Sequence, residues 1–508
     1  MSRISESGLE KSLWKTTEKL RKNIETSEFK HLVLGLIFLK YISDSFEETY
    51  REIENGEGVY GMSDPEDRDE YIAKAAFYVP QEARWSYLRK NANQVGIGGL
   101  IDSAMDAIEA ENPMLKDVLP KVYGRDNLDR NSLKGLIYAV SNIEMGDVRS
   151  SHEDMLGNVF EYFLGEFDQA AGKQGGQFYT PRSLVELLVT MLEPYKGSVY
   201  DPCCGSGGMF IQSEKFVKEH QGKIDDITIY GQESNQTTWK LTKMNLEIRG
   251  IDSSQVKWNN EGSFLKDAHP DLKADYIMAN PPFAGRDWWD SKLTSDKRWL
   301  YGIPPKRSSD YAWIQHIVSH MSPTGKAAII LGNNSLSNKI GSEHKIRRSM
   351  IQDGNIVECI VDLPAGLFTN TEIPVSLWFL NLGRKNGHLR RKEILFINAR
   401  NLGELVDRRR KSLTVEDIRT ISDTYHMWIK GEESYKDVKG FCASAPLKKV
   451  YELDCVLTPI RYVGVADIYI DKIDFRKCFT ELITEFEAQL AEEESINRNL
   501  IEMLRNVN

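Results

Sequence analysis

The sequence predicts an α/β protein: a helical N-terminal domain, then a Rossmann-like domain with a doubly wound, mostly parallel sheet, then a C-terminal helical tail. Three observations lead to this fold class. Apolar residues recur at helical spacing from residue 9 to about 150, where strand-like runs are scarce. From Ser198 onward, short β-rich runs alternate with helical stretches, as in parallel sheets with crossover helices. Residues 475 to 503 repeat mostly apolar positions at alternating spacings of four and three, which is typical of a helix that packs on another helix.

The N-terminal domain is expected to comprise residues 1-150. A second helix should run from about Glu28 through Phe46, and the glycines and prolines between Gly56 and Pro65 predict a loop. No group of residues in this half suggests chemistry. The apolar series of the first helix is Leu9, Leu13, Trp14, Leu20 and Ile24.

The β-rich runs define a second domain, expected over residues 151-440, and residues 441-508 form a C-terminal region with the packing helix. In parallel sheets, ligands bind beyond the carboxyl ends of the strands. The chemically suggestive motifs follow the β-rich runs directly, so we expect one site at that edge. The runs lie at residues 199–200, 227–230, 276–279, 327–331, 356–362 and 375–380.

The composition favours a soluble protein. A hydrophobic content of 41% and a charged content of 28% are ordinary for globular chains. The longest apolar run, Leu32 to Leu39, is far shorter than the roughly 20 residues of a membrane span, and residues 1–6 lack the apolar stretch of a secretory signal. The six cysteines include no CxxC pair, so we expect no zinc site and no disulfide framework. We therefore expect a cytoplasmic protein without a membrane segment or a metal.

A glycine-rich loop, Asp201 to Gly208, follows the first run, and we expect a helix to begin near Met209. Its glycines let the backbone turn tightly and approach a ligand, because no Cβ intrudes. The sequence contains neither a P-loop nor a GxGxxG fingerprint, so a phosphate cradle is not indicated. A purely structural turn is the alternative. The candidate cofactor-binding residues are Asp201, Gly205, Ser206, Gly207 and Gly208.

Glu233 ends the second β-rich run, about 30 residues after the glycine loop. An acidic side chain there can accept hydrogen bonds from both ribose hydroxyls of an adenosine group, as in related dinucleotide folds. A lone glutamate after a strand is usually a surface residue. The position of Glu233 relative to the loop nevertheless favours the ribose role.

The motif Asn280-Pro281-Pro282-Phe283 follows the third run and carries the catalytic prediction. The exocyclic amine of adenine is a poor nucleophile, because its lone pair is delocalised into the ring. The Asn280 side-chain carbonyl and the Pro281 main-chain carbonyl could accept from its two N–H bonds and localise that pair. The prolines stiffen the loop and remove competing N–H donors, and Phe283 offers a face for an unstacked base. We expect these four residues to form the catalytic motif for methylation of a flat amine.

A fourth segment leads into a helix expected over Ser183 to Leu192. Thr180 before Pro181 fits a helix N-cap with proline at the first helical position, and this structural interpretation is sufficient. The functional alternative is that polar and aromatic side chains close over the methionine end of a cofactor. The segment is Gln177, Phe178, Tyr179, Thr180, Pro181 and Arg182.

With these four motifs in this order, the chain resembles the modification (methyltransferase) subunits of type I restriction–modification systems over nearly its whole length. The order of cofactor segment, glycine loop and catalytic motif is that of the gamma-type amino methyltransferases, and Arg298-Trp299 adds to the resemblance. The resemblance implies a class I methyltransferase domain that binds S-adenosylmethionine through residues 177–182, 206–208 and Glu233. It also implies methyl transfer to adenine N6 in double-stranded DNA at the Asn280 motif.

The resemblance also implies partners. In such complexes a separate specificity subunit chooses the DNA site, two methyltransferase chains clamp the DNA, and a restriction motor–nuclease subunit joins. A net charge of −10 fits a chain that does not grip DNA alone, since phosphate contacts come from Lys and Arg. The helix at residues 475 to 503 packs either on its own domain or, as we expect, on the specificity subunit.

Two other functions are compatible with parts of this pattern. Methylation of cytosine N4, of an RNA base or of a protein glutamine amide uses a similar motif on a flattened amine. A non-catalytic scaffold that only clamps DNA would not need the glycine loop, Glu233 and Asn280. Phe283 and the full-length resemblance favour adenine, and the three intact motifs favour catalysis.

Overall fold

The computed structural model separates into two compact units, Met1–Val463 and Gly464–Asn508, which are described here individually. The predicted domains 1-150, 151-440 and 441-508 stay a prediction. Within the described residues, no helix is long and apolar enough to cross a membrane. The structure describes residues 6–21, 24–56, 63–73, 76–125, 128–142, 149–171, 180–220, 222–223, 226–283, 285, 287–339, 341–368, 371–385, 389–406, 410–431, 433–465 and 475–505.

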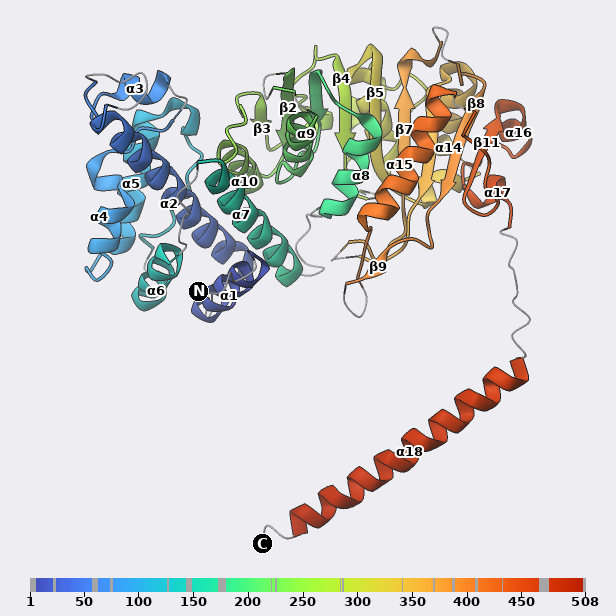
Figure 1. Cartoon of the computed structure of the whole chain (residues 1–508). Coiled ribbons are helices and arrows are strands. Elements are labelled where there is room, and N and C mark those ends of the chain that lie inside the picture. Colours follow the sequence, from blue (N-terminus) through green and yellow to red (C-terminus); the bar gives the residue numbers. More distant parts are fainter. Residues whose placement is uncertain are drawn as a thin grey trace. The chain divides into compact units, whose positions relative to one another are not determined.

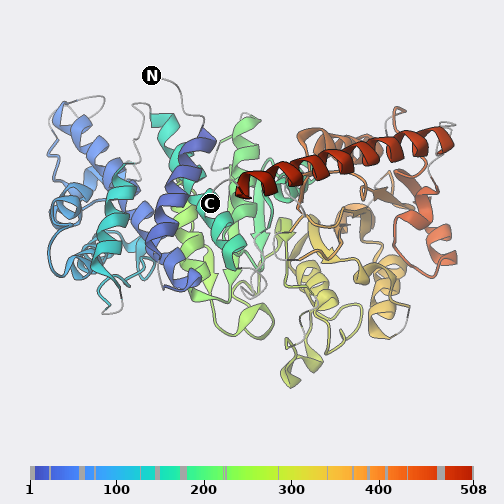
Figure 2. The ribbon, with the colours of Figure 1, turned by 90° about the horizontal axis from the view of Figure 1, so that it is seen from below.

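Helices fill the N-terminal region, as predicted (Figure 1). α2 extends eight residues beyond the predicted end at Phe46, because Thr49 and Ile53 continue its buried face at a spacing of four. α2 and α7 lie side by side in Figures 1 and 2. The helices are α1 (Glu6–Leu20), α2 (Thr26–Glu54), α3 (Arg68–Ala73), α4 (Trp85–Lys90), α5 (Ile97–Glu111), α6 (Arg130–Ser141) and α7 (Arg149–Ala171).

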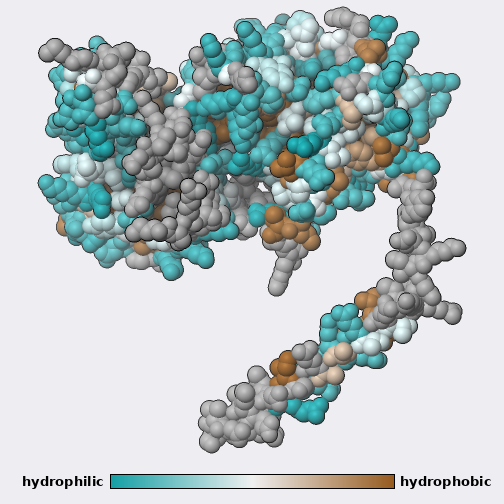
Figure 3. All heavy atoms as spheres, in the orientation of Figure 1, coloured by the Kyte–Doolittle hydropathy of each residue, from teal (hydrophilic) through white to brown (hydrophobic). Residues whose placement is uncertain are grey.

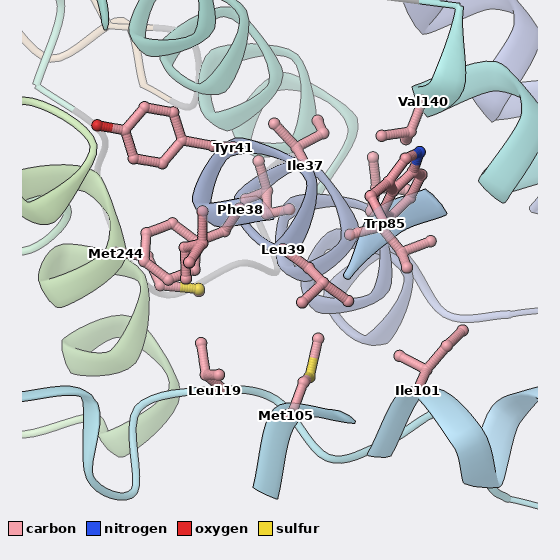
Figure 4. Packing of buried hydrophobic residues seen from close by; sticks show 14 of the residues in the cluster. Ile37, Phe38, Leu39, Tyr41, Trp85, Ile101, Met105, Leu119, Val140 and Met244 are labelled. Atoms are coloured by element: carbon pink, nitrogen blue, oxygen red, sulfur yellow. The ribbon is translucent and has the colours of Figure 1, made fainter. Parts of the chain in front are cut away.

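The core of this region surrounds the middle of α2. Nearly every residue from Leu32 to Ile42 is buried, so this helix is apolar on all sides and is covered by other helices. Figure 4 shows Phe38 beside Met244, a residue of α10 (Gln236–Glu247) from the sheet region. The N-terminal core therefore continues into the sheet domain.

The sheet has nine strands in the order β11-β8-β6-β7-β5-β4-β1-β2-β3. Most neighbouring pairs are parallel, as predicted, but β7 is antiparallel to β5 and β6, and β11 is antiparallel to β8. The bounds are β1 (Gly197–Asp201), β2 (Ile227–Glu233), β3 (Val256–Trp258), β4 (Ala274–Ala279), β5 (Met321–Gly332), β6 (Val357–Asp362), β7 (Val375–Asn381), β8 (Glu393–Asn398) and β11 (Cys442–Pro446).

Three strands of the nine-stranded sheet were not predicted. β3 has three residues, and two of them are exposed, so it shows no alternation. β8 is a short buried apolar run, which periodicity alone cannot distinguish from a helix segment. β11 consists mainly of small residues and ends in Pro446, a composition of low strand propensity.

Helices cover both faces of the sheet and create two cores. Neighbouring strand residues enter different cores: Val199 packs with α8 and α9, whereas Tyr200 packs with α12. The carboxyl ends of the central parallel strands remain available for a site. The remaining helices are α8 (Arg182–Leu192), α9 (Gly208–Glu219), α11 (Gly262–Leu265), α12 (Asp310–His320), α13 (Asn334–Ser337), α14 (Ser342–Ser349), α15 (Val415–Lys430), α16 (Leu447–Glu452) and α17 (Ile460–Val463). A small hairpin pairs β9 (Glu404–Leu405) with β10 (Lys411–Ser412).

The second unit contains one long helix, α18 (Phe475–Arg505), where the sequence predicts the packing helix.

Close packing in the N-terminal core gives a stability prediction. A Cβ on Gly98 would lie 1.9 Å from the Tyr123 carbonyl oxygen, whereas a Cβ on the adjacent Gly99 meets nothing within 4 Å. We expect Gly98→Ala to destabilise the protein by about 1–3 kcal/mol, because the backbone must shift. Gly99→Ala should leave stability unchanged or slightly raised, because alanine favours helix. Thermal unfolding of both variants measures the difference, and equal midpoints would contradict this packing.

A candidate cofactor and substrate site

A cavity of about 850 Å³ lies at the carboxyl ends of β1, β2 and β4. This volume is in the range of cofactor and small-molecule sites, roughly 300–1,000 Å³. All four predicted segments contribute to its wall. The predicted residues that line it are Thr180, Asp201, Gly205, Ser206, Gly208, Glu233, Asn280 and Pro282.

The other predicted residues lie elsewhere. Arg182 is half-exposed and forms an ion pair of 2.9 Å with Glu186, one turn along α8. Phe283 packs edge-to-face on Phe368, with ring centroids 5.4 Å apart. Pro181, Gly207 and Pro281 are also not among the lining residues. Gln177, Phe178 and Tyr179 lie outside the described residues.

The glycine loop turns through left-handed backbone. Gly205 has φ 53° and Gly207 has φ 82°, conformations that favour glycine. The Gly207 N–H donates to the Cys204 carbonyl (2.9 Å), and α9 begins at Gly208, one residue before the predicted Met209. Gly205 thus presents only backbone to the cavity.

Glu233 stands against this loop at the end of β2. Its carboxylate accepts from the backbone N–H of Asn235 (2.8 Å) and of Gly205 (3.2 Å). Burial raises the pKa of this carboxyl, and the backbone donors oppose that rise. The two oxygens retain acceptor capacity toward the cavity, since a carboxylate offers about four acceptor sites.

Asn280 is held by Thr180. Its amide nitrogen donates to the Thr180 hydroxyl (2.9 Å), while Oδ1 is buried and has no hydrogen-bond partner in the described part of the chain. The predicted N-cap role of Thr180 is wrong, because Pro181 is extended (ψ 136°) and caps α8 itself. The helix starts one residue later than that role requires, so the Thr180 hydroxyl points to Asn280 instead.

Asp201 lies at the floor of the loop and is almost completely buried. Burial raises its pKa to about 7, although the Cys203 N–H donates to Oδ1 (3.0 Å) and opposes that rise. Burial also raises the pKa of the Cys203 and Cys204 thiols well above the usual range. Both thiols therefore stay protonated near neutral pH and are poor nucleophiles.

Arg298 holds two residues of the cavity wall in place through hydrogen bonds to their carbonyls. Its guanidinium donates to the carbonyls of Ser263 and Phe264, which both line the cavity, and to His316 Nδ1 (2.9 Å). His316 is fully buried, and burial lowers its pKa well below the usual range, so the ring is a neutral acceptor. The resemblance singled out Arg298 without a role, and the structure gives it this one.

His316 also belongs to a cluster with Asp267 and His320 whose ligand atoms lie within 4.8 Å of one another. The Asp267 carboxylate is 2.9 Å from His320 Nε2 and 3.9 Å from the Arg298 guanidinium. Arg298 therefore already supplies the positive charge that a metal would bring, and we interpret the cluster as a structural network.

Several cavity residues were not predicted. α11 contributes Ser263 and Phe264, and two tryptophans, Trp288 and Trp313, add aromatic surface. The adjacent Trp288-Trp289 pair was a sequence feature that could have indicated them. The N-terminal helices also contribute to the wall through Thr26, Lys30, His31, Leu164 and Phe167.

The Asp201 carboxyl gives a pH prediction. Its pKa of about 7 lies above the usual 3.8, so between these values the folded protein keeps a proton that the unfolded chain releases. The wild type should therefore lose up to about 1.4 kcal/mol of stability per pH unit as pH rises through this window, levelling off above about pH 8. Asp201→Asn removes this loss, since an amide does not ionise. Chemical denaturation between about pH 5 and pH 8 measures the free energies of unfolding of both proteins. If the two free energies changed with pH in parallel, the burial of this group would be contradicted.

Comparisons with known proteins agree with this architecture. Residues 151–470 match the family N-6 DNA Methylase, and residues 9–140 match the HsdM N-terminal domain. The HindI methylase subunit of a type I restriction enzyme from Haemophilus influenzae is 44% identical over 83% of this chain and 99% of its own length. The MjaIX methylase subunit from Methanocaldococcus jannaschii is 38% identical over 97% of this chain and 90% of its own length.

Among solved structures, a type I restriction–modification methyltransferase subunit from Streptococcus thermophilus has the same fold. Its TM-score is 0.76 at 20% identity, over 91% of this chain and 100% of that one. The predicted fold class and the resemblance stated above are thus confirmed. The chain belongs to the N-6 DNA methylase family, among the methylase subunits of type I restriction enzymes.

Proposed function

We propose that the cavity binds S-adenosylmethionine together with a flipped adenine, and that Asn280 activates the N6 amine of that base. Membership of the family establishes the reaction class, DNA methylation at adenine N6, and does not favour the cytosine, RNA, protein or scaffold alternatives. The observation that carries the proposal is the buried Oδ1 of Asn280 at the cavity wall, which has no hydrogen-bond partner among the residues that the structure describes. A buried acceptor without a donor is costly, and the amine of a bound base would supply that donor.

The residues present fit the cofactor. The glycine loop offers backbone that lets a ligand approach closely, since a Cβ on Gly205 or Gly208 would meet almost nothing. Glu233 can accept from ribose hydroxyls, and Phe264 offers an aromatic face for a purine. When bound, S-adenosylmethionine supplies an electrophilic methyl group on its sulfonium. We therefore assign Asp201, Gly205, Ser206, Gly208 and Glu233 to cofactor binding.

Asn280 and the two prolines that follow it would act on the target adenine. Asn280 Oδ1 would accept from one N6–H bond and the carbonyl of Pro281, which lies between the lining residues Asn280 and Pro282, would accept from the other. This would draw the amine toward tetrahedral geometry and localise its lone pair. Pro281 and Pro282 bring no N–H that could compete for these acceptors. No group needs to remove a proton before attack, because the positive charge on the amine develops only as the N–C bond forms.

We further propose that the chain acts with a specificity subunit, a second copy of itself, double-stranded DNA and a restriction subunit. α18 offers the docking surface: its exposed apolar side chains appear brown in Figure 3. An isolated helix would not keep such a stripe in water, so a partner helix is the fitting occupant. The stripe contains Phe479, Leu482, Ile483, Phe486, Leu490 and Ile496.

The proposed function is tested by transfer of labelled methyl groups from S-adenosylmethionine to DNA, with and without the specificity subunit of the same system. We expect label in adenine N6 only when the specificity subunit is present. Asn280→Ala should lower the rate at least about a hundredfold, because it removes a preorganised acceptor at the reacting amine. Label in cytosine or protein, or full transfer by the chain alone, would contradict the proposal.

Thr180 gives a second prediction. Thr180→Val keeps the shape but removes the acceptor that holds the Asn280 amide, so kcat should fall about tenfold while the Kd for S-adenosylmethionine stays unchanged. Thr180→Ser keeps the hydroxyl and should restore most of kcat. Single-turnover methylation and calorimetric binding separate the two quantities. A raised Kd with unchanged kcat would show that Thr180 serves the cofactor rather than Asn280.

A further inference from the structure

α10 is shared by two hydrophobic cores. Leu241 and Met244 of α10, together with its C-cap Ile248, are buried in the N-terminal core, whereas Leu246 is buried in the core on one face of the sheet. Figure 1 shows α10 between the N-terminal helices α2 and α7 and the strands β2 and β3, and Figure 4 shows Met244 beside Phe38 of α2. Any movement of the N-terminal helices against the sheet must therefore displace α10 or break one of these packings.

The same helix holds the glycine loop. The Thr242 hydroxyl donates to the Gly205 carbonyl, and the Asn245 amide donates to the Ser206 carbonyl (2.8 Å). Both side chains are buried, so these contacts are shielded from water. A Cβ on Gly207 would lie only 3.0 Å from Thr242, which shows how closely the loop rests on α10.

Arg249, just beyond α10, connects this contact to α7. Its guanidinium donates to Asn245 Oδ1 (2.6 Å) and to the Gly157 carbonyl of α7 (2.7 Å), and it lies 3.5 Å from the Glu161 carboxylate. Because Arg249 binds the oxygen of the Asn245 amide, the nitrogen must face the loop. The orientation of the group that holds Ser206 thus depends on a contact with an N-terminal helix.

We propose that Asn245 and Arg249 are positioning residues that couple the N-terminal helices to the cofactor site. α7 fixes the position of the Arg249 guanidinium, and Arg249 fixes the orientation of the Asn245 amide. Asn245 in turn fixes the backbone of the glycine loop, which would lie against the cofactor. The N-terminal residues Lys30 and Phe167 line the same cavity, which gives the helices a second route to the ligand. This inference rests on the proposed function, and it assigns the N-terminal helices a role in cofactor affinity beyond structural support.

The first test is calorimetric binding of S-adenosylmethionine by the full-length chain. Arg249→Ala should raise the Kd about fivefold to tenfold. Arg249→Lys keeps a positively charged donor but lacks the planar guanidinium with its several N–H groups, so it should give a smaller rise. kcat at saturating cofactor should change less than about twofold, because neither residue touches the reacting atoms. Arg84→Ala is the matched control: it removes a partly buried Arg–Glu pair (2.9 Å) in the N-terminal region, far along the chain from the loop. It should lower the Tm without changing the Kd.

The second test uses the reciprocity of coupled sites. If α7 affects the cofactor, the bound cofactor must stabilise α7 by the same free energy. Hydrogen exchange of amides near Gly157 and Glu161 should slow when S-adenosylmethionine binds to the wild type and should slow less in Arg249→Ala at the same degree of saturation. The coupling alone is overturned if Arg249→Ala leaves the Kd unchanged, or if hydrogen exchange in the wild type is the same with and without the cofactor. A wild type that does not bind S-adenosylmethionine overturns the proposed function as well.

Discussion

The proposed site depends on Oδ1 of Asn280, a buried acceptor with no hydrogen-bond partner among the described residues. Leaving a buried polar atom without a partner costs about 1–3 kcal/mol. The arrangement of the neighbouring groups explains why no donor reaches this oxygen. Thr180 occupies the amide nitrogen, and the two following prolines contribute no N–H donors. Among the described residues this acceptor therefore has no donor, and the amine of the proposed substrate would supply one.

This arrangement depends on the topology of the sheet. β4 pairs with β1, with Val199 opposite Tyr276, so the glycine loop and Asn280 leave the sheet at the same level. Thr180 lies 100 residues before Asn280, yet it reaches the same edge because α8 packs over the face that carries Val199. Parallel strands bring motifs that are distant in sequence to one edge, and this accounts for a site assembled from four segments.

The sequence sufficed to bring together in one cavity wall those candidate residues that lie at or directly after the end of a strand. The glycine loop, Glu233 and Asn280 each have a local pattern, and each lies in the cavity wall. The role of Thr180 was predicted wrongly, because its partner is fixed by tertiary packing while a threonine before a proline fits a local cap equally well. Lys30 and Phe167 could not be predicted for the same reason: they enter the wall through the packing of α2 and α7, which no short motif encodes. β8 was missed because four buried apolar residues carry no period.

The electrostatics of the cavity connect these structural constraints to its ligand. Burial raises the pKa of both Asp201 and Glu233, and the charge of Glu233 further raises that of Asp201. Two carboxyls that oppose each other's ionisation form a site that favours a cation, because a positive charge between them lowers both pKa values. The proposed cofactor, S-adenosylmethionine, carries a net positive charge at neutral pH, so its binding would favour the ionised form of both carboxyls. A bound cation would offset part of the cost of burying these carboxyls, so a positively charged ligand would be favoured by charge as well as by shape.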